Sequence, residues 1–415
     1  MVTRLRNLVL YVSCALLLLS GCQPISPVDG LSGRITFWHS WTGEDAAELR
    51  SVLRRFQEIH PGVRIAEISL PEDQILAEYR AAARNGLAPG VLLGRNRWIP
   101  ELAGDGLIRP FPAAEAALVT SNIRNRAIVE YNDQLFGLPL FLAPRALYYN
   151  KSLVSEPSTT LDELLQQAAA GKRVEFVPRF EEAYWGIQAF GEGLFDADRR
   201  FTLAESGFEE WLAWLDRAQR AQGVILNVDD ESLLDLFASG LMAYYVSGPE
   251  SIKAISASMD PDNPFEIGVV PLPGGPNGPS GPIAEAETLM FFAHASPQEA
   301  RIANVLATFL YNERQGIQFM RELDKVPANP RIVADRRVYP LVSGFVQQAR
   351  TAVALPNGIP RDQLSAAGNR AYTSVLSGAA SPAEAVCQFG EDVVGFLDYT
   401  ADQVELPETC ETADN

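Results

Sequence analysis

Apolar and polar residues follow one another along the chain in patterns that predict strands and helices in turn. Residues 34–38 form a short β-type run, and apolar positions three and four apart over 44–59 predict an amphipathic helix that Pro61-Gly62 ends. The pattern continues with an expected strand over 63–70, a helix over 72–84 and a strand over 91–93. This alternation is typical of parallel β-α-β units.

The same alternation resumes farther along the chain. Strands are expected over 146–149, 242–246, 267–270 and 289–293, and helices over 161–170, 209–221, 233–239 and 297–311. Residues 271–282 are rich in proline and glycine and predict a loop, and the chain from residue 332 is expected to be mostly helical. About 390 residues follow the first 22, which is more than a single hydrophobic core usually supports. A second α/β lobe is therefore expected.

The N-terminal segment predicts the location of the protein. Arg4 and Arg6 precede an apolar run over 8–19, which ends in Leu19-Ser20-Gly21-Cys22. This pattern indicates a lipoprotein signal over 1–22 with lipid on Cys22, followed by a flexible tether over 23–33. An uncleaved membrane helix would need about 20 apolar residues, and this run is shorter. We therefore expect an extracytoplasmic protein attached to the cell membrane through a lipid anchor.

Charge narrows the possible partners. The formal net charge is -18, and loss of Arg4 and Arg6 with the signal makes it -20. Such a surface repels phosphate backbones, so nucleic acid is not an expected partner.

Two cysteines are left once Cys14 leaves with the signal and Cys22 carries lipid. Cys387 and Cys410 are then expected to form a disulfide outside the cytosol, which would hold the acidic tail on the last helix. Two unpaired thiols are the alternative.

Motifs for catalysis, metals and cofactors are scarce in the sequence. The three histidines are isolated from one another, and no H-E-x-x-H, C-x-x-C, phosphate-binding or dinucleotide-binding motif occurs. We therefore expect no metal, no cofactor and no enzymatic activity. Glu181-Glu182 and the pair Glu285 and Glu287 are the carboxylate sets that would suit a glycoside hydrolase.

Several ordered motifs carry a family resemblance. Tyr131-Asn132 through Gly137-Leu138-Pro139 to the run 146–151 matches a hairpin, a crossover and an "L-x-Y-N-K" strand. Residues 237–249 match an "F-x-x-G-x-x-A-M-x-x-x-G-P" segment, and 267–275 match its "G-V-x-P-x-P" successor. In these motifs the chain resembles the extracellular solute-binding proteins of the maltose-binding, sugar-type family, which serve ABC importers.

The resemblance implies an architecture and a set of partners. It implies an α/β, two-lobe periplasmic-binding-protein (Venus-flytrap) fold with hinge crossovers near Ala143, Glu287 and Asn329. The N-terminal lobe would comprise 34–142 plus 288–328, and the C-terminal lobe 143–287 plus 329–415. The expected partners are a small-molecule solute of the carbohydrate class and the permease subunits of an ABC importer, with the protein itself a monomer.

Candidate ligand-binding residues lie on loops at the carboxyl ends of predicted strands, where open α/β sheets bind ligands. They are Trp41 and Thr42 after the first strand, Asn96, Arg97 and Trp98 after the third, Phe141 at the first crossover, Tyr184 and Trp185 in the second lobe, and Glu250 and Glu287. Competing interpretations are a lid over the helix for Trp41, core packing for Trp185, hinge packing for Phe141 and a helix N-terminal charge for Glu250.

The sequence departs from the family at its stacking positions. Gly94, Glu250 and Ser365 fall where the maltose-binding protein places tryptophans on its ligand. A malto-oligosaccharide ligand is therefore put in doubt.

Three functions are compatible with the sequence. The leading hypothesis is capture of a small carbohydrate or polyol-like solute and its delivery to an ABC importer permease. The alternative is a surface lipoprotein of the same fold with a sensing or protein-binding role. A carboxylate-pair glycoside hydrolase is the third.

Overall fold

The computed structural model describes residues 30–112, 126–397 and 399–411. The expected signal over 1–22, its lipidated Cys22 and most of the tether lie outside the described residues. Within the described ranges, every helix is too short or too polar to cross a membrane.

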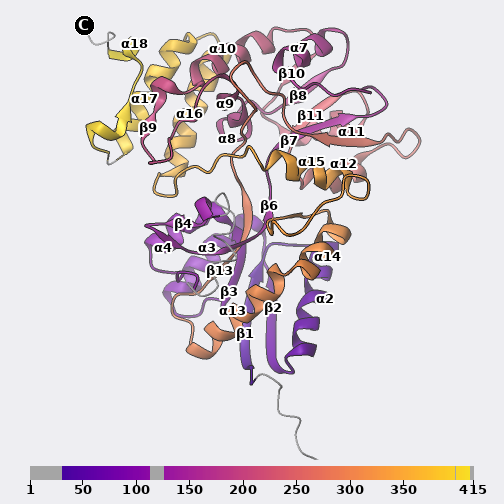
Figure 1. Cartoon of the computed structure of the whole chain (residues 1–415), viewed down its shortest axis with the longest axis vertical. Coiled ribbons are helices and arrows are strands. Elements are labelled where there is room, and N and C mark those ends of the chain that lie inside the picture. Colours follow the sequence, from indigo (N-terminus) through magenta and orange to yellow (C-terminus); the bar gives the residue numbers. More distant parts are fainter. Residues whose placement is uncertain (1–29, 113–125, 398, 412–415) are drawn as a thin grey trace, which may run out of the picture.

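Two separate sheets organise the molecule into two lobes (Figure 1). The six-stranded sheet has the order β14-β6-β13-β3-β1-β2. Its strands are β1 (Ser32–His39), β2 (Gly62–Ser69), β3 (Val91–Arg95), β6 (Leu138–Leu142), β13 (Ala286–Phe291) and β14 (Val326–Pro327). The five-stranded sheet has the order β10-β8-β11-β7-β12. Its strands are β7 (Ala146–Asn150), β8 (Val174–Phe176), β10 (Val224–Leu226), β11 (Tyr244–Ser247) and β12 (Ile267–Val270). We call the lobe around the first sheet the N-lobe and that around the second the C-lobe.

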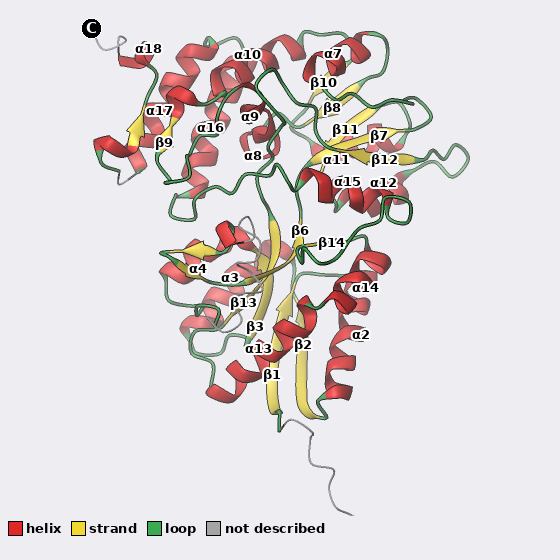
Figure 2. Cartoon of the chain, viewed as in Figure 1, coloured by secondary structure: helices red, strands yellow, loops and turns green. Residues whose placement is uncertain are grey.

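Helices cover both sheets, as Figure 2 shows. The N-lobe contains α2 (Gly43–Ile59), α3 (Glu72–Arg84), α4 (Ile99–Gly104), α13 (Pro297–Tyr311) and α14 (Glu313–Leu323). The C-lobe contains α7 (Leu161–Ala169), α8 (Phe180–Ala183), α9 (Ile187–Phe190), α10 (Phe208–Gln219), α11 (Asp230–Ala238), α12 (Ser251–Ser258), α15 (Pro340–Gln348), α16 (Arg361–Leu376), α17 (Pro382–Phe396) and α18 (Glu408–Glu411).

Short elements complete the fold. They are the 3-10 turns η1 (Asn96–Trp98), η2 (Tyr184–Gly186), η3 (Leu203–Glu205) and η4 (Ala401–Gln403), the β4 (Glu130–Tyr131) and β5 (Gln134–Leu135) hairpin, and the pair β9 (Phe201–Thr202) and β15 (Val404–Glu405). The hairpin turns at Asn132 and Asp133, whose φ angles of 46° and 60° suit the short polar side chains that tolerate this region.

The expected strand-helix alternation is confirmed, but the pairing of strands is mixed rather than parallel throughout. β1 pairs parallel with β2 and β3, whereas β13 pairs antiparallel with β3 and β6. The predicted strand over 289–293 was placed too late. The strand begins at Ala286, where Glu287 and Thr288 already pair with β6. The prediction missed these residues because they are polar and do not continue the apolar pattern by which the strand was located.

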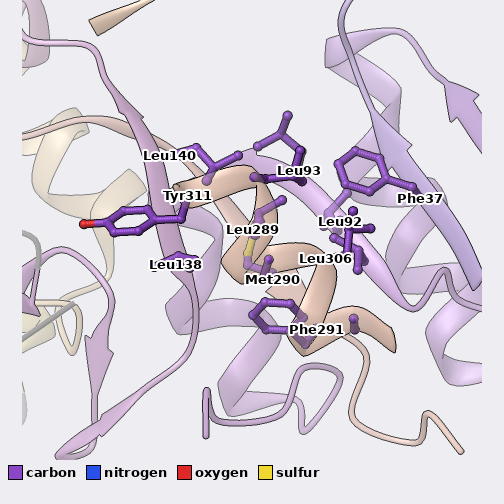
Figure 3. Packing of buried hydrophobic residues seen from close by; sticks show 14 of the residues in the cluster. Phe37, Leu92, Leu93, Leu138, Leu140, Leu289, Met290, Phe291, Leu306 and Tyr311 are labelled. Carbon is purple, nitrogen blue, oxygen red and sulfur yellow. The ribbon is translucent and has the colours of Figure 1, made fainter. Parts of the chain in front are cut away.

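The N-lobe core combines many aliphatic side chains with aromatic ones, some of them in pairs such as Phe111 and Phe291. Leu92 on β3, Leu289 on β13 and Leu306 on α13 meet there (Figure 3). These residues are almost completely buried. The core therefore holds α13 against the sheet and fixes the ends of β1 and β3, whose loops face the other lobe.

The C-lobe core is strongly aromatic. Trp211 lies between two other tryptophans, with ring centroids 4.7 Å from Trp185 and 5.0 Å from Trp214. Its Nε1 donates to the carbonyl of Ala183 and to the hydroxyl of Tyr372, both at 2.9 Å. Burial of these large rings stabilises the lobe.

The chain passes between the lobes three times. It leaves the N-lobe sheet after β6 and enters the C-lobe sheet at β7, returns between β12 and β13, and crosses again between β14 and α15, which packs on β12. These passages form the hinge region of the two-lobe α/β fold. Near the C-terminus, a disulfide joins Cys387 of α17 to Cys410 of α18, with their Cα atoms 5.1 Å apart.

Candidate functional site: a charged cleft between the lobes

Four adjoining cavities lie where the two lobes face each other. Their volumes are about 460, 430, 230 and 140 Å³. The largest is bordered by Trp41 and Thr42 of the N-lobe and by Glu250 and Lys253 of the C-lobe. Arg97 and Glu181 border both the 430 and the 230 Å³ cavities, so these two cavities are neighbours. We call these four cavities together the cleft. Their combined size is that of a small-ligand site.

Trp98 provides an aromatic wall of the cleft. It ends η1, which directly follows β3, and its side chain borders the two largest cavities. The ring lies over Gly94, where a Cβ atom would come within 2.1 Å of a ring carbon. Gly94 is therefore required so that the ring can lie there. The aromatic side chain missing at position 94 is replaced in space by that of Trp98.

Trp41 also borders the largest cavity, but other protein groups hold its ring. Its Nε1 donates to Glu287 Oε2 at 2.6 Å, and Lys325 Nζ lies 4.2 Å from the ring centroid. Phe141 and Phe319 pack against it at 5.7 and 5.8 Å. Trp41 is 7% exposed and Trp98 8%, so exposure does not distinguish the two rings. Trp41 is a fixed wall of the cleft because Glu287 binds its Nε1 and Lys325 lies over its ring.

A histidine beneath this loop positions Trp41. His39 Nδ1 accepts a hydrogen bond of 3.0 Å from the Trp41 backbone N–H, and Nε2 lies 2.7 Å from a carboxylate oxygen of Glu67. Burial lowers the pKa of His39, against the opposing effect of Glu67. The neutral imidazole thus donates to Glu67 and accepts from Trp41, which orients the loop after β1.

Three sequence candidates do not lie in the cleft. Tyr184 and Trp185 have no exposed surface and pack inside the C-lobe, Trp185 against Phe176 and Trp211. Their placement as ligand contacts was wrong, because aromatic residues suit a core as well as a binding site. Asn96 is 5% exposed, and its Oδ1 accepts from the backbone N–H of Ala286. It joins η1 to the start of β13 and contacts no cavity of the cleft.

The other candidates border the cleft. Thr42 precedes α2 without capping it through its side chain, and Phe141 borders the smallest cavity while packing on Trp41. Arg97 reaches across to Glu181 at 3.5 Å. Glu250 directly precedes α12 and pairs with Arg145 at 3.2 Å. Arg97 and Glu250 thus face the space between the lobes.

Ion pairs dominate the chemistry of the cleft. Each basic side chain that borders it within the described residues has a carboxylate partner, namely Arg95 with Glu72, Arg97 and Arg361 with Glu181, Arg145 with Glu250, Arg179 with Glu182, Lys253 with Asp45, and Lys325 with Glu287. Such pairs present fixed donors and acceptors without a large unbalanced charge.

Glu181 is the most highly connected of these carboxylates. It accepts from Arg361 Nε at 2.8 Å and from Ser365 Oγ at 2.6 Å, with Arg97 on its other oxygen. Burial opposes its ionisation, but the charge of Arg361 and the hydrogen bond from Ser365 prevail and lower the pKa of Glu181. Glu181 is therefore a permanent acceptor. Ser365, one of the positions where the family has a stacking ring, belongs to this network.

Sequence analysis missed several cleft residues, chiefly Asp45, Arg145, Lys253, Lys325 and Arg361. They come from segments far apart in the chain, so no local motif joins them. One signal was present. The chain has 34 basic residues, of which only four are lysines, leaving 30 arginines, and two of those four lysines are in the cleft.

Comparisons with known proteins agree with this geometry. Residues 51–342 match the model of the family described as bacterial extracellular solute-binding protein. The chain is 24% identical over 352 residues to the maltotriose-binding protein of Pyrococcus abyssi, covering 78% of this chain and 73% of that protein. It is 21% identical over 378 residues to the galactooligosaccharide-binding protein of Bacillus subtilis, covering 85% and 87%.

Solved structures share the fold. A cyclo/maltodextrin-binding protein complexed with maltotetraose aligns with a TM-score of 0.77 at 20% identity, covering 88% of this chain and 98% of that one. The cyclic α-maltosyl-1,6-maltose-binding protein of Arthrobacter globiformis aligns with a TM-score of 0.74 at 20% identity, covering 88% and 99%. Since the family model spans most of the chain and the two-lobe fold agrees with it, this protein belongs to the bacterial extracellular solute-binding protein family.

Proposed function

We propose that this protein binds a short carbohydrate in the cleft and delivers it unchanged to the permease of an ABC importer. It acts outside the cytoplasmic membrane, held there by lipid on Cys22. Its named relatives bind maltotriose and galactooligosaccharides, which supports a carbohydrate ligand. Family membership supports a binding role without catalysis.

The observation that carries this proposal is the ring of Trp98 among the paired charges of the cleft. A sugar has apolar C–H faces that pack on an aromatic ring and hydroxyl groups that need fixed donors and acceptors. Trp98 supplies the ring, and the Arg97–Glu181 and Arg145–Glu250 pairs supply polar groups elsewhere along the cleft. Both requirements are met by residues that line the adjoining cavities of the cleft.

The same geometry supports a short ligand. A long malto-oligosaccharide needs several stacking rings in a row. In this cleft Gly94 carries no side chain, Glu250 pairs with Arg145, and Ser365 binds Glu181. Trp41 has Lys325 over its ring. Trp98 is thus the ring placed to stack on a sugar, and one or two sugar units match one ring.

The hydrolase alternative finds no support at Glu181. A general acid of a glycoside hydrolase needs a raised pKa so that it holds a proton. The lowered pKa of Glu181 is the opposite condition.

Calorimetric titration tests the proposal, with glucose, galactose, maltose, lactose, maltotriose and a galactotriose as probes. We expect a mono- or disaccharide to bind, with the Trp98→Ala variant binding at least tenfold more weakly, because the loss of a ring contact is worth more than about 1.4 kcal/mol. Trp38→Ala is the matched control. Trp38 is a partly buried tryptophan of the same lobe that packs on Tyr79 and borders no cavity of the cleft. Absence of binding to every probe, or equal weakening by both variants, contradicts the proposal.

A further inference from the structure

The largest cavity of the cleft contains a carboxylate shared by two lysines. Asp45 lies in the first turn of α2 in the N-lobe. Its Oδ1 accepts from Lys253 Nζ at 2.7 Å, and its Oδ2 lies 3.5 Å from Lys325 Nζ. Lys253 belongs to α12 of the C-lobe, so the first of these contacts crosses the cleft.

The second lysine joins Asp45 to the hinge. Lys325 directly precedes β14, from which the third crossover departs, and it donates to Glu287 Oε1 at 2.7 Å. Glu287 lies at the start of β13, where the second crossover arrives. Its other oxygen accepts from Trp41. A series of polar contacts thus connects Trp41, on the loop after β1, through Glu287, Lys325 and Asp45 to Lys253 in the C-lobe.

The two contacts of Asp45 differ in what lobe movement does to them. Asp45 and Lys325 both belong to the N-lobe, so movement of the C-lobe as a unit does not separate them. The Lys253 side chain is 39% exposed and is held by the other lobe, with Glu44 at 3.7 Å as a second partner. Separation of the lobes removes Lys253 from both carboxylates.

We infer that Lys253 is a positioning residue for lobe closure, which it stabilises by pairing with Asp45 across the cleft. This rests on the proposed function only in that closure surrounds a ligand. Lys325 holds the Asp45 carboxylate in place in the open arrangement, so that Lys253 meets a preoriented acceptor. Closure then needs no rearrangement of the N-lobe, and its cost is mainly the desolvation of one ammonium group.

Distances between the lobes in the ligand-free protein test this inference. Spin labels are attached at Leu87→Cys in the N-lobe and Leu241→Cys in the C-lobe, which are exposed positions. Pulsed electron paramagnetic resonance measures the distances between the labels and so reports the populations of open and closed arrangements. We expect Lys253→Met to lower the ratio of closed to open protein about two- to fivefold, the range of a partly exposed ion pair. Lys253→Arg keeps the charge and restores the ratio. Raising the salt concentration from about 0.1 to about 1 M reduces the ratio more in wild type than in Lys253→Met, where pairs such as Arg97–Glu181 still cross the cleft.

Lys151→Met is the matched control, because Lys151 pairs with Glu266 within the C-lobe and its loss breaks an ion pair that does not cross the cleft. An unchanged ratio in Lys253→Met, or an equal shift in Lys151→Met, overturns the inference. No sugar is present in this experiment. A shifted ratio together with failure of every sugar probe therefore refutes the proposed ligand and leaves the inference standing.

Discussion

Tryptophans lie both in the C-lobe core and in the cleft, but their surroundings differ. In the core, Trp185, Trp211 and Trp214 pack on one another with no ion pair among them. In the cleft, Trp41 and Trp98 are surrounded by charged pairs. A ring in the core stabilises the fold because it is buried. A ring in the cleft is held by its neighbours so that one part of it remains available to a ligand. The comparison shows that tryptophans near a cleft are not equivalent, and that charges decide which of them a ligand can reach.

The strongest way to break this comparison is to remove the central core ring. Trp211→Ala deletes a fully buried side chain with two hydrogen bonds, and we expect a loss of about 3 to 5 kcal/mol in the free energy of unfolding. Urea denaturation followed by circular dichroism measures it. Trp98→Ala is the comparison within the same assay and should destabilise less, because Trp98 keeps 8% of its surface exposed at the cleft whereas Trp211 has none. Equal losses would mean that Trp98 is a core residue and would remove the basis of the distinction.

The next largest effect is expected at a buried carboxyl group of the C-lobe that has no hydrogen-bond partner within the described structure. Glu175 lies in the middle of β8, has no exposed surface, and neither of its oxygens has a hydrogen-bond partner within the described structure. Burial, with a smaller effect from the charge of Asp230, raises the pKa of Glu175 from 4.5 to about 9. Between these values the unfolded chain has lost a proton that the folded protein retains. The free energy of unfolding therefore falls as pH rises, by about 1.4 kcal/mol per pH unit.

The measurement for Glu175 is a series of unfolding curves from pH 5.5 to pH 8. Wild type should lose about 3 kcal/mol over this range, and Glu175→Gln, which cannot ionise, should not show this part of the loss. Identical pH profiles for the two proteins would show that Glu175 is ionised and paired in solution.

The smallest effect is expected from the well-paired carboxylate of the cleft. Because the pKa of Glu181 is lowered in the folded protein, its stabilising contribution is present above pH 4.5 and is lost as the pH falls through the folded value. Glu181→Gln should cost about 1 kcal/mol at pH 7 and weaken the acid-induced loss. Glu182→Gln, which alters one pair with Arg179, is the control. A Glu181→Gln protein as stable as wild type would indicate that the network around Glu181 serves the ligand alone.

Much of the fold was predictable because local patterns determine it. The helix over 72–84 and the strand over 267–270 have the predicted bounds, since apolar periodicity and neighbouring turn residues are local signals. The site was harder. Trp185 resembled a ligand contact because sequence does not reveal which rings a core encloses. Gly94 suggested a lost ring, whereas Trp98 lies over that glycine. The Lys253–Asp45 pair joins residues 208 positions apart, which no local pattern can connect.

The first strand has a consequence for how the molecule would work on a membrane. β1 starts at Ser32, beside the expected tether, and ends at His39, next to the loop that carries Trp41. The eight residues of the strand separate these two points by about 23 Å. If lipid on Cys22 holds the protein, as we propose, the attachment therefore enters the N-lobe at the end of β1 that is farther from the cleft.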